Sequence, residues 1–299
     1  MSRRPGMSTV ELVVSLTIAG ILSASIGALL RRQQRFYTRA ALAVEQRVSL
    51  RDATSILPGE LRALSPAGGD VLAFSDSSLD IRAAIGAAVV CAVGPDGTTV
   101  DLNPTGHAAA TVMASFSTSP QPGDIALVYG AAMTDDSLDD GWLARDVVST
   151  SARDDTCTAS PLVPVDLADV SRIRLGLASS LPASVRSGSF VHVVRRVRYR
   201  LYRASTGDWY LGYSEWGGAS FSVVQPVSGP FAPYSRRAVN TGLLLRYFDG
   251  DGGEVTSQTD VRRITRVEIV ARSAEVGQLS DDTTAARDAQ DITVGVRNR

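Results

Sequence analysis

The chain has 299 residues, of which 44% are hydrophobic and 20% are charged. This composition is typical of a folded globular protein and excludes disordered and collagen-like chains. The net charge of −1 gives no overall basic field that would recruit nucleic acid. Two histidines and two cysteines exclude His/Cys metal clusters and a disulfide-dense scaffold.

An uncharged apolar run extends from Leu12 to Leu30. As a helix it would span about 28 Å, close to the thickness of a bilayer core. A secretory signal peptide would have a shorter apolar stretch followed by a small-residue cleavage site, and no such site is evident here. We therefore predict a transmembrane segment over about residues 12–30. Arginines flank it on both sides, so the positive-inside rule leaves its orientation open: Arg3, Arg4, Arg31, Arg32 and Arg35.

Glu11 is an acidic residue directly before this apolar run. A charge near a membrane core is costly unless it is paired. One interpretation is a carboxylate at the start of a helix, stabilised by the helix dipole. The other is that Glu11 pairs with a second protein subunit during assembly, and the residues before it favour this interpretation.

Gly6, Met7 and Glu11, followed by the apolar helix, resemble the leader of type IV prepilins. The resemblance implies a leader over residues 1–6, cleavage by a prepilin peptidase between Gly6 and Met7, and methylation of the Met7 amine. It also implies that Glu11 pairs with the amine of a neighbouring subunit in a filament. Met7 and Ala28 depart from the major pilins, which usually have Phe and often Pro at these places.

The helix should continue beyond Leu30 as the second half of a spine over residues 7–64. We predict an amphipathic stretch with a break or kink at Pro58–Gly59, because proline removes a helical hydrogen bond. Its apolar residues recur at helical spacing, namely Tyr37, Ala41, Val44, Val48, Ala53, Leu57, Leu61 and Leu64.

Residues 65–299 read as a β-rich head, so the predicted fold is α+β, with a long N-terminal helix packed on an antiparallel sheet. Short strands alternate with turn residues. They are expected at 71–74, 78–81, 87–93, 111–116, 125–129, 190–202, 209–213, 242–248, 254–257, 264–271 and 292–297. Tyr247–Gly252, Val296–Asn298 and the spine end from Leu50 to Arg62 resemble PilW-type minor pilins, which are related to GspJ-type pseudopilins. Residues 65–190 match no family.

Two side-chain sets in the head are candidate sites. Cys91 and Cys157 would lie in the oxidising periplasm, where we expect a disulfide; two separate buried thiols are the alternative. Arg196, Arg198 and Arg200 share one face of a strand. They could contact an acidic neighbour, protect a strand edge or, less favoured, bind DNA phosphates.

Other motifs argue against catalysis. Asp249 and Asp251 lie in a glycine-rich turn that departs from a calcium-binding loop, and the acidic segment 135–140 suits a solvated loop. His107 and His192 have no nucleophile motif near them, and nucleotide-binding and metalloprotease motifs are absent from the sequence. We therefore expect no enzyme activity, cofactor or metal.

The resemblance implies a type IV minor pilin that helps to prime pilus assembly in a tip complex. The implied partners are the prepilin peptidase, other minor pilins, the major pilin, an inner-membrane assembly platform and a tip adhesin. The protein would be held in the inner membrane with its head in the periplasm and then enter an extracellular pilus. A type II secretion pseudopilin and a membrane-tethered periplasmic binding domain are the alternatives.

Overall fold

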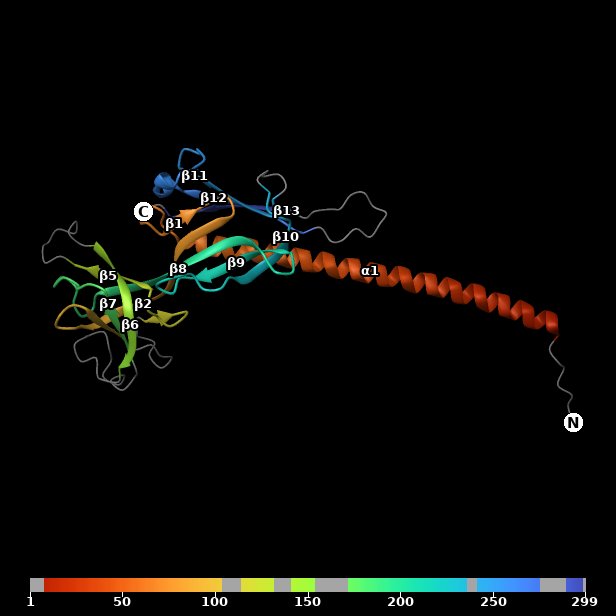
Figure 1. The fold of residues 1–299 in the computed structure, drawn as a ribbon, viewed down its shortest axis with the longest axis horizontal. Coiled ribbons are helices and arrows are strands. Elements are labelled where there is room, and N and C mark those ends of the chain that lie inside the picture. The colour runs from red at the N-terminus through yellow and green to blue at the C-terminus, as the bar shows by residue number, and fades with distance from the viewer. Residues whose placement is uncertain are drawn as a thin grey trace.

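The computed structural model describes residues 8–103, 114–131, 141–153, 172–235, 241–274 and 289–297. Within these ranges one long helix precedes a β-rich head, as expected for an α+β protein (Figure 1). The helix is α1 (Thr9–Ala63), and a 3-10 helix, η4 (Gln258–Arg263), lies in the head. The strands are β1 (Val71–Phe74), β2 (Ser78–Val93), β3 (Thr99–Leu102), β4 (Ser115–Phe116), β5 (Ile125–Gly130), β6 (Gly141–Arg153), β7 (Arg172–Leu177), β8 (Phe190–Arg203), β9 (Trp209–Glu215), β10 (Gln225–Phe231), β11 (Leu243–Phe248), β12 (Arg266–Arg272) and β13 (Ala289–Gly295).

Helix α1 passes through Pro58 and ends at Ala63, so of the predicted break or kink at Pro58–Gly59 the break does not occur. A proline inside a helix removes one backbone hydrogen bond. Leu57 and Leu61, on either side of it, are each about 1% exposed. Burial of these side chains against the head holds the helix together where local propensity alone would end it.

The C-terminal part of α1 packs between two sheets and contacts β10, β12 and β13. With β1, β9, β11 and the adjoining parts of β2 and β8, these elements form the proximal lobe of the head (Figure 1). The buried helix residues are Leu50, Ala53, Leu57, Leu61 and Leu64. Tyr37, Val44 and Val48, which were expected on the same packed stripe, are exposed.

The other lobe is a closed antiparallel barrel. The strand pairings run β2–β3, β3–β7, β7–β6, β6–β5 and β5–β8, and the β2–β8 pairing closes the ring of six strands. Closure leaves these strands without a free edge over the paired stretch. The barrel interior is apolar, consisting of Ile85, Ala88, Val90, Val100, Leu102, Ala126, Val128, Val147, Leu175, Leu177, Leu181, Val185, Val191 and Val193.

The long strands β2 and β8 belong to both lobes. The short strands predicted at 78–81 and 87–93 are two parts of β2, which bends at a bulge between Ala84 and Gly86. Four strands were not predicted from the sequence, namely β3, β6, β7 and β10, and the strand predicted at 254–257 was wrong. Glu254 forms a single bridge to Phe248, and η4 follows shortly after it.

A buried ion-pair network joins the lobes at Arg195. The Arg195 side chain is 4% exposed, and its guanidinium donates to both carboxylate oxygens of Asp124 at 2.7 and 2.9 Å. It also donates to Glu215 and Thr118, and to the backbone carbonyl of Ser119. The hydrogen bond to Asp124 raises the pKa of Arg195 above its ordinary value. This network connects the β4–β5 segment of the barrel to β9 of the proximal lobe.

A residue without a side chain is required at position 86, where β4 pairs with β2. A Cβ at Gly86 would collide with the Phe116 ring and the Ser115 carbonyl oxygen. We expect Gly86→Val to lower the free energy of unfolding by about 1–3 kcal/mol through overpacking, as measured by urea unfolding of the full chain in detergent. Gly141→Val is the control, because no atom lies within 4 Å of a Cβ there. Equal effects of the two substitutions would contradict this account.

Candidate functional site

The N-terminal half of α1 projects from the head as a rod, and the barrel lies at the opposite end of the molecule (Figure 1). Residues 9–38 are long and apolar enough to span a membrane, and none of the most apolar window is buried. Val10 and Ile21, for example, are 69% and 67% exposed. A continuous apolar surface of this extent marks a membrane or protein contact.

Three of the four hydroxyl side chains inside the apolar run are satisfied by their own helix. Ser15 and Ser25 each donate to the carbonyl four residues earlier at 2.8 Å, and Thr17 donates to the carbonyl of Val14 at the same distance. Such bonds remove hydroxyl groups from an apolar surrounding at little cost. This agrees with the expectation that these residues are compatible with a membrane helix.

Glu11 occupies the first turn of α1, three residues after the N-cap residue Ser8. The Ser8 hydroxyl accepts from the backbone N–H of Val10 at 3.3 Å, which fixes the start of the helix. The Glu11 carboxylate is exposed and makes no ion pair or hydrogen bond with any described residue. Gly6 and Met7, the predicted cleavage residues, lie outside the described residues.

The basic residues of β8 divide between two faces. Arg196 and Arg198 both bind Asp80, whose side chain is 4% exposed, while Arg200 is exposed. Arg198 is bidentate, with its Nε at 2.6 Å and its Nη2 at 2.8 Å from the carboxylate oxygens. The structure therefore places Arg196, Arg198 and Arg200 on one face, as predicted, but Arg198 forms an ion pair within the chain. Arg195, their neighbour, belongs to the opposite face and the buried network.

Cys91 is buried in β2 and is disulfide-bonded. The Arg172 guanidinium donates to its sulfur at 3.2 Å. Cys157, the other cysteine of the sequence, lies outside the described residues, as do His107 and the acidic segment 135–140.

The other candidate sites have structural partners. Asp249 accepts from the backbone N–H groups of Asp251 and Gly253 and from Arg263, as a turn carboxylate does. His192 stacks edge-on against Trp142, with 4.9 Å between ring centroids. Among the described residues no group of three or more His, Cys, Asp or Glu side chains could hold a metal ion.

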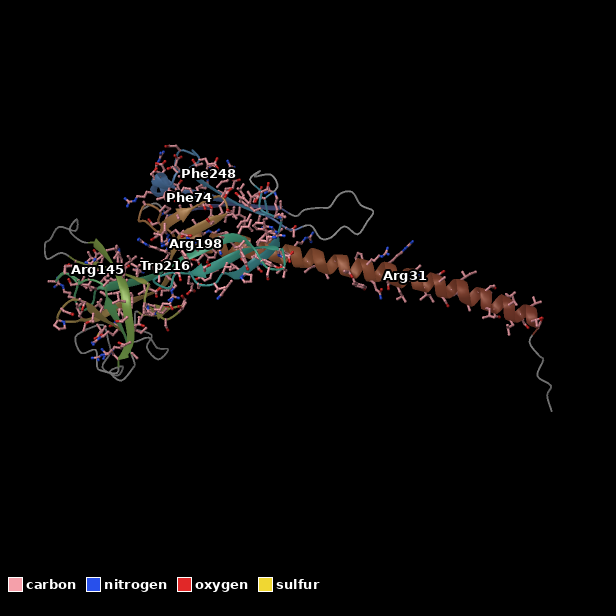
Figure 2. The ribbon with its side chains drawn as sticks, viewed as in Figure 1. Arg31, Phe74, Arg145, Arg198, Trp216 and Phe248 are labelled. Carbon is pink, nitrogen blue, oxygen red and sulfur yellow. The ribbon has the colours of Figure 1, made fainter. Side chains whose placement is uncertain are left out.

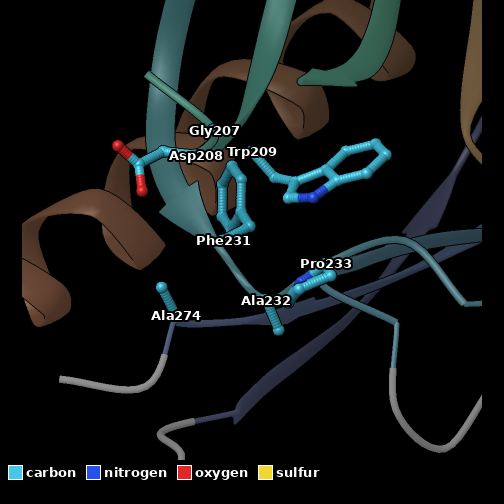
Figure 3. Close-up of a pocket in the computed structure, with 7 residues that line it drawn as sticks. All are labelled: Gly207, Asp208, Trp209, Phe231, Ala232, Pro233 and Ala274. Atoms are coloured by element: carbon cyan, nitrogen blue, oxygen red, sulfur yellow. The ribbon is translucent and has the colours of Figure 1, made fainter. Parts of the chain in front are cut away.

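One pocket of about 310 Å³ lies in the proximal lobe (Figure 3). It is lined by Gly207, Asp208, Trp209, Phe231, Ala232, Pro233 and Ala274. Asp208 is the one ionisable side chain among these described lining residues.

The candidate functional site of the described structure is thus the exposed apolar half of α1 with the unpaired Glu11 carboxylate, because both features are expected to contact a membrane or another protein. No protein-family model, curated protein or solved structure matches the chain.

Proposed function

We propose that this chain is a type IV pilin-like subunit of the minor-pilin kind, which is stored in the inner membrane and then built into a filament. The observation that carries the proposal is the exposed apolar half of α1, with Glu11 at its start and a folded head at its other end. Such a helix needs an apolar environment at every stage. A bilayer supplies it before assembly, and neighbouring apolar helices supply it afterwards.

The lone carboxylate gives this helix a means of selecting its register. Apolar helix packing alone is tolerant of sliding, whereas an unpaired charge in an apolar surrounding is costly. Cleavage after Gly6 would create an amine at Met7, four positions before Glu11. Pairing between the amine of one subunit and Glu11 of the next would then define one favoured alignment.

The architecture of the head suits a subunit that carries an additional domain-like lobe, the barrel, far from its membrane segment. The helix is anchored in the proximal lobe, so the barrel is held at the end of the molecule farthest from the membrane segment (Figure 1). In a fibre this arrangement would direct the barrel outward. We assign it to contacts with other tip subunits or an adhesin, rather than to catalysis.

Mass spectrometry of the protein purified from membranes tests the proposal. We expect a mature chain that begins at N-methylated Met7, and immunogold labelling of sheared fibres to detect the subunit. Replacing Gly6 with valine should leave the leader attached and prevent incorporation. An intact Met1 in the unmodified protein would instead indicate a tethered periplasmic domain, and a cut near residue 30 would indicate a secreted one. Correct processing with labelling confined to the cell envelope would favour a secretion pseudopilin.

A further inference from the structure

A surplus of positive charge lies on the face of β2 and β8 that points away from α1. Strand alternation separates this face from the core, because Val197 and Tyr199 turn toward the helix while Arg196, Arg198 and Arg200 turn away. Asp80 is the one acid on the paired β2 segment 78–84, and it serves both Arg196 and Arg198. Arg200 has no acceptor among the described residues.

Arg82 adds a further cation to this face. It is the register partner of Arg196 across the β2–β8 pair. Directly opposed side chains on antiparallel strands lie on the same face, and like charges in this position repel. The Arg82 side chain makes no hydrogen bond or ion pair with any residue that the structure describes, and one of its terminal nitrogens lies near Gly69. The nearby Asp70 carboxylate accepts instead from the backbone N–H of Ser65 at 2.9 Å.

The two opposed arginines also hold unsatisfied donors. The Nε atoms of Arg82 and Arg196 are both buried and have no acceptor. A buried N–H without an acceptor destabilises the fold. Two such atoms on register-paired arginines indicate that this part of the sheet lacks hydrogen-bond acceptors, and a small anion would supply them.

An aromatic pair orients the Arg196 side of this site. The Arg196 guanidinium lies 5.0 Å from the ring centroids of both Trp216 and Phe221, and Arg198 lies 4.0 Å from that of Phe221. Figure 2 places Arg198 and Trp216 in the middle of the head, where the two lobes meet. The Arg196 side chain keeps 33% of its surface exposed, so a ligand can approach it from solvent.

We propose that Arg82 and Arg196 form a binding site for a single oxyanion group, a phosphate or a carboxylate. Arginine is suited to this task because its planar guanidinium can donate two parallel hydrogen bonds to either group. Arg198 stays paired with Asp80 and supports the site without being part of it. The site does not depend on the proposed role in a filament, since its residues all lie in the head.

Calorimetric titration of the full chain in detergent and chloride buffer tests the site, with inorganic phosphate and acetate as separate probes. We expect saturable binding of at least one of them. Arg82→Gln should weaken it about tenfold, corresponding to the loss of one charge-assisted hydrogen bond. Arg266→Gln is the matched control, because it removes the same charge from a guanidinium that stacks on Phe248 in the other sheet. The control should leave the affinity unchanged.

A melting experiment separates ligand binding from a structural role. Because Arg82 has no acceptor among the described residues, Arg82→Gln should not lower the unfolding midpoint without anion, but about ten times more anion should be needed to produce the same rise in the midpoint. Competition by a DNA oligonucleotide would identify a phosphodiester as a source of the group, and binding of acetate alone would identify a carboxylate. Absence of binding by both small anions, including a case in which DNA binds, would overturn the proposal. So would equal losses in Arg82→Gln and Arg266→Gln.

Discussion

Replacing Asp124 with alanine is expected to lower the free energy of unfolding by about 3–5 kcal/mol, because it leaves a buried arginine without its main partner. Asp124 is fully buried and holds two of the Arg195 N–H groups. The Arg195 side chain is itself 4% exposed, so water cannot replace the lost carboxylate without opening the junction between the lobes. Urea unfolding of the full chain, followed by circular dichroism, measures the effect.

A surface ion pair provides the control for Asp124→Ala. Arg246 pairs with Glu254 at 3.1 Å, but the two side chains are 39% and 43% exposed. Glu254→Ala should therefore cost no more than about 1 kcal/mol. If Asp124→Ala were equally mild, the Arg195 network would not contribute appreciably to holding the barrel and the proximal lobe together beyond their shared strands β2 and β8. Two separate unfolding transitions in the Asp124 variant would show that the lobes had become uncoupled.

Replacing Glu11 with alanine is expected to reduce incorporation of the subunit into fibres at least tenfold while leaving the head folded. In the proposed function, the Glu11 carboxylate pairs with the Met7 amine of a neighbouring subunit inside an apolar bundle. Tenfold corresponds to about 1.4 kcal/mol, which is small beside the cost of leaving a charge unpaired in such a surrounding. Quantitative immunoblotting of sheared fibres against the total membrane pool measures the change.

Ser15→Ala is the control for Glu11→Ala. Ser15 lies one turn further along the same helix, and its hydroxyl is satisfied by the carbonyl of Glu11 at 2.8 Å. Its removal should leave incorporation within about twofold. An unchanged fibre content in Glu11→Ala would contradict the proposed register contact. A loss in both variants would indicate that the helix surface matters as a whole rather than through its carboxylate.

The helix was predictable because its signal is local. An uncharged run of membrane length is a property of consecutive residues, and α1 contains the whole of the predicted segment 12–30. The predicted spine ended at residue 64, one residue past the observed end, but local reasoning did not predict that the helix would continue unbroken through its proline. Local propensity favours a stop at Pro58, whereas the buried neighbours Leu57 and Leu61 carry the helix to Ala63 through contacts with distant strands.

The strands show the same division. The segments 190–202 and 209–213 were predicted as strands, and they form β8 and β9, which pair with each other. Strand β6 was missed because its residues alternate weakly and most are exposed or half-buried. In the barrel β6 pairs with β5 on one side and β7 on the other. These pairings provide its backbone hydrogen-bond partners, which the local sequence of β6 does not predict.

The arginines of β8 illustrate what the sequence alone determined and what it left open. Strand periodicity placed Arg196, Arg198 and Arg200 on one face, since side chains alternate along a strand. The sequence could not show which residues face these arginines. In the structure Asp80 forms an ion pair with Arg198, and Asp124 forms a buried ion pair with Arg195. Arg82 lies opposite Arg196 across the β2–β8 pair. Those pairings join residues 71 to 118 positions apart, so they depend on strand register and barrel closure. The sequence alone therefore determined which arginines share a face of the strand, and the tertiary fold determined which residues pair with them.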